Sequence, residues 1–314
     1  MKKSPIGYEI FMLNYEIITG DCLEVLKGFP DRCVQCCVTS PPYFGLRDYD
    51  NAAQIGQEGS MVDYIRRIVD VFSQVHRVLR DDGTLWLNLG DSYNAAGRKG
   101  QGAREGYKQG INRASALGKD TMRPSDRNLK PKDLMGIPWR VALALQDFGW
   151  YLRQDIIWHK PNPMPESVKD RCVKSHEYLF LLAKNERYYF NHLALQEPSI
   201  KGASGSRFDV GKTGIHQGGR SSRANREDEG KRNKRDVWSI PTYGYKEAHF
   251  ATFPPRLVEP CILAGAPEGS VVLDPFAGSG TTGMVARQKG RAFVGIELNP
   301  EYAELARSRI MGDK

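Results

Sequence analysis

Short apolar segments alternate with amphipathic segments along most of the chain. The short segments are rich in β-branched and aromatic residues, as strands are. They are Tyr15–Thr19, Val34–Thr39, Thr84–Leu89, Tyr151–Trp158, Glu177–Ala183, Val271–Leu273 and Ala292–Ile296. The amphipathic segments, with apolar residues at helical spacing, are Val62–Leu79, Trp139–Phe148, Arg256–Ala264, Thr281–Gln288 and Pro300–Ile310. Strands that alternate with helices in this way predict an α/β fold.

Two stretches interrupt the alternation and are dominated by charge. Residues 93–132 carry ten Lys or Arg against three acidic residues, and residues 198–236 carry ten against five, with glycines throughout both. We interpret both as surface loops or inserts, either simply solvated or in contact with a polyanion. The 314-residue chain has a formal net charge of +8, which favours a polyanionic partner only mildly.

Composition excludes several classes of protein. Every apolar run is too short to cross a bilayer, and Glu9, Asn14 and Glu16 interrupt any secretory segment near the amino terminus. We therefore expect no membrane association and a cytoplasmic location. Six cysteines in a chain of this size are expected to be free thiols. Cys33 and Cys36 lie in an apolar segment without a second ligand pair, so we expect core packing and no metal.

A glycine-rich turn follows the strand Val271–Leu273 and leads into a helix. The turn reads Asp274-Pro275-Phe276-Ala277-Gly278-Ser279-Gly280-Thr281-Thr282. Its glycines let the backbone approach a ligand, and its threonines can place hydroxyls near the unpaired amides of the helix start. An ordinary strand-to-helix turn is the alternative. The pattern favours a nucleotide-like ligand at the carboxyl edge of a parallel sheet.

Two carboxylates narrow the choice of that ligand. Glu297 ends the next strand, 17 residues after Gly280, where it can accept hydrogen bonds from both hydroxyls of a ribose. Asp274 would repel a pyrophosphate, whereas it would attract the cationic amino-acid end of S-adenosylmethionine (SAM). Charge therefore favours SAM over a dinucleotide.

A second motif follows the strand Val34–Thr39, and it reads Ser40-Pro41-Pro42-Tyr43. The two prolines stiffen the turn and remove two backbone donors, so its carbonyls face whatever cavity the turn lines. An exocyclic amino group could donate to such a carbonyl and to Ser40, while Tyr43 stacks on the base. This arrangement suits a flat nitrogen heterocycle that carries an amino group.

The two motifs together resemble the catalytic and SAM-binding motifs of the amino-group DNA methyltransferases. The catalytic motif precedes the SAM motif, which resembles the β-class order of that family. Further matching segments are Asp82–Trp86 with Asp91, Gly149–Trp150, Trp158–Asn162, Ser175–Tyr178 and His249–Pro254. Only the two basic stretches lie outside the resemblance.

The resemblance implies a SAM-dependent methyltransferase fold with a circularly permuted motif order. Its sheet would be mixed, mostly parallel and seven-stranded, with helices on both faces, and a methyl group would pass directly from SAM to a flipped base. Carried over by position, the target-amino site would be Ser40, Pro41, Pro42 and Tyr43. The SAM site would be Asp21, Thr39, Asp274, Pro275, Phe276, Gly278, Ser279, Gly280, Thr281, Thr282 and Glu297.

The resemblance also implies a division of the chain. Residues 1–190 would be the catalytic half with the insert 93–132, residues 191–245 a target-recognition region, and residues 246–314 the SAM-binding half. Double-stranded DNA is the expected partner, and a restriction endonuclease counterpart and a homodimer are further expectations. The expected DNA contacts are Arg207, Arg220, Arg223, Arg226, Arg232 and Arg235.

The target base is chosen from one residue. In this family a serine before Pro-Pro-Tyr is commoner among cytosine-N4 enzymes, whereas Asp or Asn is commoner among adenine-N6 enzymes. Ser40 therefore favours cytosine, with adenine as the alternative. A DNA-binding regulator that has lost catalysis is the alternative of another class, although both motifs are intact.

Overall fold

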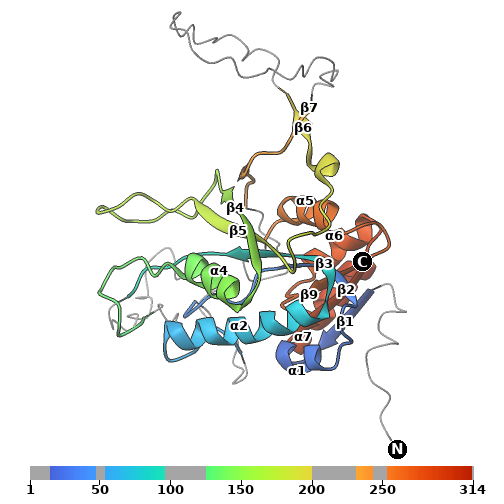
Figure 1. Cartoon of the computed structure of the whole chain (residues 1–314). Coiled ribbons are helices and arrows are strands. Elements are labelled where there is room, and N and C mark those ends of the chain that lie inside the picture. The colour runs from blue at the N-terminus through green and yellow to red at the C-terminus, as the bar shows by residue number, and fades with distance from the viewer. Residues whose placement is uncertain (1–14, 47–53, 96–124, 200–230, 243–252, 313–314) are drawn as a thin grey trace, which may run out of the picture.

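A mixed β-sheet runs through the part of the chain that the computed structural model describes, which is residues 15–46, 54–95, 125–199, 231–242 and 253–312. Its strands are β1 (Tyr15–Thr19), β2 (Val34–Thr39), β3 (Leu79–Leu89), β4 (Tyr151–His159), β5 (His176–Ala183), β8 (Val237–Ser239), β9 (Val271–Asp274) and β10 (Ala292–Glu297). Their order in the sheet is β1-β10-β9-β2-β3-β5-β4-β8 (Figure 1). The predicted mostly parallel sheet is confirmed.

The direction of β5 decides which residues reach the working edge of the sheet. β5 is antiparallel to both of its neighbours, β3 and β4, and every other pairing in the sheet is parallel. The first residues of β5 therefore lie at the edge where the other strands end. The described sheet has eight strands, one more than predicted, because the short strand β8 pairs with β4.

Helices cover both faces of the sheet, as predicted. One face carries α1 (Cys22–Lys27), α2 (Met61–Val78) and α4 (Ile137–Phe148), and the other carries α5 (Pro255–Gly265), α6 (Thr281–Gln288) and α7 (Pro300–Met311). A short 3₁₀ helix, His192–Leu195, packs near α5. No helix in the described part of the chain combines the length and apolar character needed to cross a membrane.

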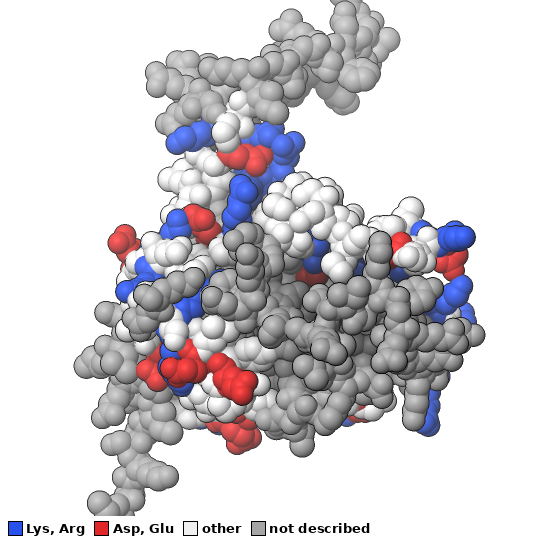
Figure 2. Space-filling view, turned by 180° about the vertical axis from the view of Figure 1, so that it is seen from behind, with Lys and Arg blue, Asp and Glu red and all other residues white. Residues whose placement is uncertain are grey.

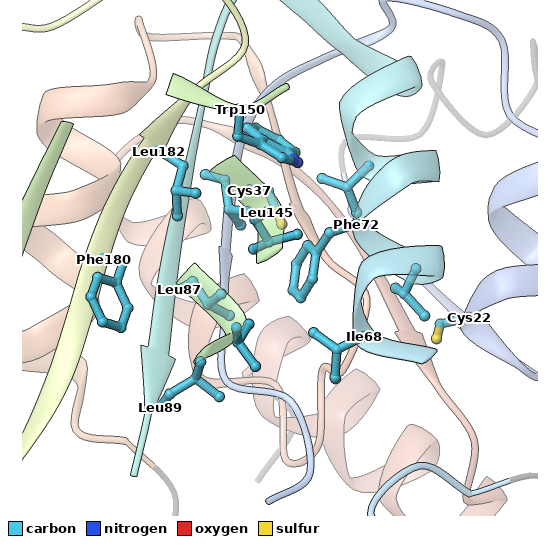
Figure 3. Packing of buried hydrophobic residues seen from close by; sticks show 14 of the residues in the cluster. Cys22, Cys37, Ile68, Phe72, Leu87, Leu89, Leu145, Trp150, Phe180 and Leu182 are labelled. Atoms are coloured by element: carbon cyan, nitrogen blue, oxygen red, sulfur yellow. The ribbon is translucent and has the colours of Figure 1, made fainter. Parts of the chain in front are cut away.

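The period-two pattern of the strands creates two separate cores. On β3, Leu85, Leu87 and Leu89 face α2 and α4, whereas Trp86 faces α5. Figure 3 shows the first core, where Leu87 and Leu89 lie opposite the α2 side chains Ile68 and Phe72. Each side chain of this size that is fully buried stabilises the fold by about 1.5–3 kcal/mol. The sheet is thereby held rigid between two helical layers.

The ends of the first basic stretch are not the surface loop that its charge predicted. Asn94 is 3% exposed and Asp126 is 5% exposed. The Asp126 carboxylate accepts hydrogen bonds from Asn128 N (2.7 Å) and from Met61 N (2.8 Å) at the start of α2, and these two backbone N–H groups lower its pKa. The Asn94 amide donates to the carbonyls of Asp126 (3.0 Å) and Leu129 (2.8 Å). These polar groups are buried because each finds a backbone partner, while residues 96–124 lie outside the described residues.

The second basic stretch also contains regular structure. Its described part adds β7 (Lys231–Arg232), which pairs antiparallel with β6 (Glu197–Pro198). Figure 1 shows this small ladder on an arm that leaves the body beyond β4 and α5. Residues 200–230 lie outside the described residues.

Candidate functional site

The carboxyl ends of the parallel strands open on a cavity of about 950 Å³. Residues at the ends of β1, β2, β3, β4, β9 and β10 line it, and β5 contributes its first two residues, His176 and Glu177. Ligands of open α/β sheets bind at this edge. The cavity wall contains both predicted turns, Ser40–Tyr43 and Pro275–Ser279. The two turns therefore face a common pocket.

Asp274 joins the two turns, although they are far apart in sequence. Strands β2 and β9 are neighbours in the sheet, so Thr39 at the end of β2 lies beside Asp274 at the end of β9. Asp274 Oδ1 accepts hydrogen bonds from Thr39 Oγ1 (2.6 Å) and Phe276 N (3.0 Å), and Oδ2 accepts from Thr282 Oγ1 (2.6 Å). One carboxylate therefore connects the end of β2, just before the Ser40–Tyr43 turn, with the Pro275–Ser279 turn and the start of α6.

This position differs from the role that the sequence predicted for Asp274. The side chain is 1% exposed and does not line the cavity, so it is not placed to attract a cationic ligand there. Burial raises its pKa from 3.8 to about 6, against the lowering effect of the Thr282, Thr39 and Phe276 donors. Thr39, Gly280 and Thr282 are likewise not part of the cavity wall. Asp274 and these three residues therefore support the glycine-rich turn without lining the cavity.

The half of the wall that is predicted to hold the cofactor is formed by the glycine turn and two carboxylates. Gly278 has φ 50° and Gly280 has φ 78°, values that glycine adopts without strain. Glu297 Oε2 accepts a hydrogen bond from Gly278 N (2.8 Å), and burial raises the pKa of Glu297. Asp21 caps α1 by accepting from Glu24 N (3.0 Å). The predicted SAM-site residues that line the cavity are Asp21, Pro275, Phe276, Gly278, Ser279, Thr281 and Glu297.

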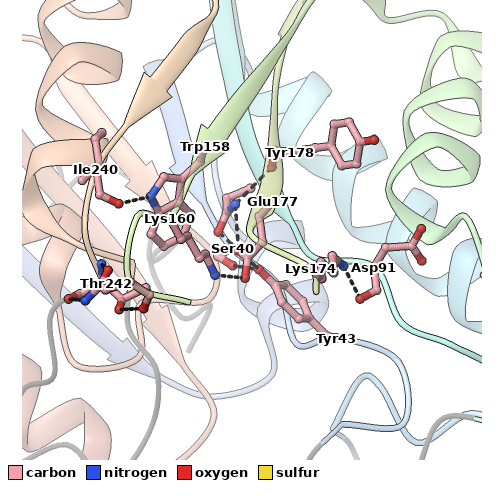
Figure 4. A network of polar contacts seen from close by, with 12 residues as sticks. Ser40, Tyr43, Asp91, Trp158, Lys160, Lys174, Glu177, Tyr178, Ile240 and Thr242 are labelled. Carbon is pink, nitrogen blue, oxygen red and sulfur yellow. Dashed lines mark hydrogen bonds and ion pairs between the residues drawn. The ribbon is translucent and has the colours of Figure 1, made fainter. Parts of the chain in front are cut away.

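The opposite half of the wall is a network of polar side chains around Tyr43 (Figure 4). The Tyr43 hydroxyl donates to Glu177 Oε2 (2.9 Å), and the Ser40 hydroxyl lies 3.4 Å from the Tyr43 oxygen. Glu177 also forms an ion pair with Lys160, in which the two side chains are only 16% and 18% exposed. Lys160 Nζ lies 4.2 Å from the centre of the Trp158 ring. All four predicted target-site residues line this half.

The sequence motifs around Lys160 and Glu177 were recognised, but no role was predicted for either residue or for Asn88. All three line the cavity. The sequence did contain an indication of their role. Glu177 and Lys160 are charged residues that lie directly at the ends of apolar strand segments and not within a polar loop. The proximity of the two residues could not be predicted, because it depends on the antiparallel direction of β5. This direction brings the start of β5 to the end of β4.

Two further cavity residues are cations or potential cations with altered acidity. Lys174 Nζ donates to the Asp91 carbonyl, and burial lowers the pKa of Lys174. Burial, followed by the nearby Lys174 and His159, lowers the pKa of His176. Burial and neighbouring positive charge therefore both favour the uncharged form of the His176 imidazole.

The predicted DNA-contacting arginines are only partly placed. Arg232 and Arg235 are described, and both direct Nε to Glu197 Oε1, at 3.0 and 3.2 Å. Figure 2 shows Lys and Arg side chains next to acidic ones where the β6–β7 arm leaves the body. One carboxylate shared by two guanidinium groups leaves a local excess of positive charge. Arg207, Arg220, Arg223 and Arg226 lie outside the described residues.

Cys33 and Cys36 pack against or within the core, as predicted. Cys36 is fully buried on the α5 side of the sheet, whereas Cys33 packs against the core on the α2 side, so the pair does not form a site. Burial raises the pKa of the Cys36 thiol to about 12. In the residues that the structure describes, no three His, Cys, Asp or Glu side chains are grouped in a way that could hold a metal ion.

Comparisons with known proteins agree with this geometry. A family model, N6_N4_Mtase, described as DNA methylase, matches residues 34–308. The Type II methyltransferase M.Cfr9I of Citrobacter freundii is 48% identical over 297 residues, covering 95% of this chain and 88% of that protein. The Type II methyltransferase M.SmaI of Serratia marcescens is 48% identical over 296 residues, covering 94% of this chain and 90% of that protein.

Solved structures share the fold. The PvuII DNA methyltransferase, described as cytosine-N4-specific, has a TM-score of 0.63 at 19% identity and covers 95% of this chain and 86% of its own. TTHA0409, a putative DNA modification methylase from Thermus thermophilus solved in complex with S-adenosyl-L-methionine, has a TM-score of 0.58 at 25% identity. That match covers 95% of this chain and 93% of the other. The predicted methyltransferase fold is confirmed.

Proposed function

The chain belongs to the DNA methylase family whose model it matches over residues 34–308, and on that premise we propose that it methylates the N4 amino group of a flipped cytosine at a specific site in double-stranded DNA. The methyl donor is S-adenosylmethionine. The observation that carries the proposal is the cavity wall, where the Ser40–Tyr43 turn and the Pro275–Ser279 turn lie on opposite halves of one pocket.

The cofactor half fits S-adenosylmethionine by the chemistry of its donors. Glu297 is a carboxylate at the end of β10, suited to the two hydroxyls of a ribose, and the Gly278 backbone can approach a ligand without a side chain in the way. Phe276, Ile296 and Tyr302 supply apolar surface beside them. When bound, S-adenosylmethionine supplies an electrophilic methyl group. The protein's task is to present the amino group to it.

The target half fits a base with an exocyclic amine. The Pro42 carbonyl accepts from the Tyr64 hydroxyl (2.9 Å), which fixes the stiff turn from behind. Ser40 and a carbonyl of the turn can then accept the two amino hydrogens, which frees the nitrogen lone pair for the new N–C bond. As the N–C bond forms, the bond between the methyl group and the sulfonium sulfur would break, and one amino proton would then pass from the nitrogen to water. We propose that the Tyr43 ring, which lines the cavity, stacks on the flipped base.

Cytosine is proposed over adenine because a serine leads the Pro-Pro-Tyr motif, as is commoner among cytosine-N4 enzymes. The test is incubation of the purified chain with methyl-labelled S-adenosylmethionine and DNA of mixed sequence, followed by digestion to nucleosides and mass spectrometry. We expect N4-methylcytosine, and no label with Ser40→Ala. N6-methyladenine alone would refute the choice of base but not the enzyme class, whereas an unlabelled product would favour a non-catalytic DNA-binding regulator.

The regions outside the cavity are assigned as proposals. We assign residues 191–245 to target recognition, supported by the basic composition of 198–236 and by the arm that β6 and β7 form. The Type II relatives support a restriction endonuclease counterpart and a cytoplasmic location. Analytical ultracentrifugation with and without DNA would test a homodimer.

A further inference from the structure

Two hydroxyl groups and a carboxylate form a chain of hydrogen bonds on the target side of the cavity (Figure 4). The Ser40 hydroxyl donates to the Tyr43 oxygen (3.4 Å), and the Tyr43 hydroxyl donates to Glu177 Oε2 (2.9 Å). Glu177 lies 134 residues further along the sequence, on β5. The orientation of both hydroxyl groups therefore depends on Glu177 of β5, a residue outside the Ser-Pro-Pro-Tyr motif.

The direction of the chain follows from the charges of its members. Tyr43 has a single hydroxyl proton and two acceptors within reach, Glu177 Oε2 at 2.9 Å and Asn88 Oδ1 at 3.3 Å. A carboxylate is the stronger acceptor and is also nearer. The Asn88 amide donates to Glu177 Oε2 (3.3 Å) and to the Tyr178 carbonyl (3.0 Å), so it supports the carboxylate. The Tyr43 proton is therefore directed to Glu177.

An ion pair fixes the position of the Glu177 carboxylate. Lys160 pairs with Glu177 Oε1, and both side chains are largely buried. Burial and the Glu177 carboxylate raise the pKa of Tyr43 well above its ordinary value, so the phenol keeps its proton at neutral pH. With its own proton directed to Glu177, the phenol oxygen presents lone pairs to the Ser40 hydroxyl.

This series of hydrogen bonds determines whether the Ser40 hydroxyl donates or accepts at the site. A hydroxyl can either donate or accept, whereas an exocyclic amine that is to be methylated needs acceptors for its two hydrogens. If the Ser40 proton pointed into the cavity, it would compete for the amine lone pair. Resting on the proposed function, we propose that Glu177 is a positioning residue that acts through Tyr43 to turn the Ser40 hydroxyl into a hydrogen-bond acceptor for the target amino group.

The test is a double-mutant cycle of Glu177→Gln and Tyr43→Phe, measured as the single-turnover rate of methyl transfer with enzyme in excess. Tyr43→Phe keeps the stacking ring and removes the hydroxyl. Each single variant should lower the rate by about tenfold, the effect of one charge-assisted hydrogen bond, while KM for S-adenosylmethionine stays within about twofold. The double variant should be about as slow as the slower single variant, because without the hydroxyl Glu177 has no path to Ser40.

A matched control is Glu259→Gln, which breaks another Lys–Glu pair (Glu259 with Lys289, 2.5 Å) away from the cavity. It should leave the rate unchanged. Losses that multiply, about 100-fold in the double variant, would overturn the proposal, since Glu177 would then act independently of Tyr43. Tyr43→Phe at the wild-type rate would overturn it even if Glu177→Gln failed to fold. A wild-type chain that methylates no DNA would remove the proposed function and this inference with it, whereas an active wild type with multiplying losses removes the inference alone.

Discussion

Replacing Asp274 by Asn isolates the cost of a buried charge. The carboxylate is 1% exposed and accepts from Thr39, Thr282 and Phe276 N. Asn keeps the shape and one acceptor oxygen. Its amide nitrogen can donate to Thr282 Oγ1, because the Thr282 hydroxyl has a second acceptor in the Val38 carbonyl at 3.3 Å. We therefore expect Asp274→Asn to fold and to lose the ionisation while keeping most of the hydrogen bonds.

The size and sign of the effect follow from the pKa of Asp274. Burial raises it from 3.8 to about 6 in the folded protein, so between these pH values the folded protein holds a proton that the unfolded chain has released. The stabilisation from Asp274 is complete below pH 3.8 and is lost as the pH rises through about 6. At 1.36 kcal/mol for each pH unit, the loss is about 3 kcal/mol.

The assay is equilibrium urea unfolding of the wild type and Asp274→Asn at a series of pH values from about 4 to about 7. Other titrating groups cancel in the difference between the two proteins. The wild type should lose about 2.4 kcal/mol relative to the variant over this range, because part of the total loss has already occurred at pH 4. A difference that is independent of pH, or that shifts in favour of the wild type as the pH rises, would show that the three donors outweigh burial and would refute the reasoning.

Three further changes test other parts of the site. Gly280→Ala should lower the free energy of unfolding by about 2 kcal/mol, because a side chain at φ 78° is strained and its methyl would lie 3.0 Å from α7; Gly59→Ala, which has open space, is the control in the same thermal melts. Tyr43→Ala should lose about 1–3 kcal/mol of base stacking relative to Tyr43→Phe, which lacks only the hydroxyl, seen as a further fall of about 5- to 150-fold in kcat/KM; equal values for the two variants would count against stacking. Neutralising Arg232 and Arg235 together should reduce the slope of log binding constant against log salt concentration by about 2, and an unchanged slope would exclude both as phosphate contacts.

The regular elements could be predicted wherever the apolar pattern was long enough. Helix α2 begins and ends within one residue of the prediction because its buried face repeats over five turns. Strand β8 was missed because three residues are too few to show alternation, and its neighbours are charged. Asp126 was misplaced because its burial depends on the Met61 backbone N–H, a partner 65 residues away that local composition cannot indicate.

The site was predictable where one continuous segment carries it. Both turns were found because stiffness and glycine content act locally, and both face the cavity. The function of Asp274 was predicted from its charge, yet its environment decides its role, and that environment comes from Thr39 on another strand. The roles of Glu177 and Lys160 were not predicted for the same reason. The two residues come together only through the antiparallel pairing of β5 with β4.

The hydrogen bonds of Asp274 have a consequence for how such a protein can change its DNA target. One side chain connects Thr39 with Thr282, so the two turns that we propose hold the amino group and the methyl donor are tied together inside the sheet. Arg232, one of the proposed DNA contacts, lies on the β6–β7 arm and pairs with Glu197, so a change there need not disturb that connection. Recognition and chemistry are thereby free to diverge separately.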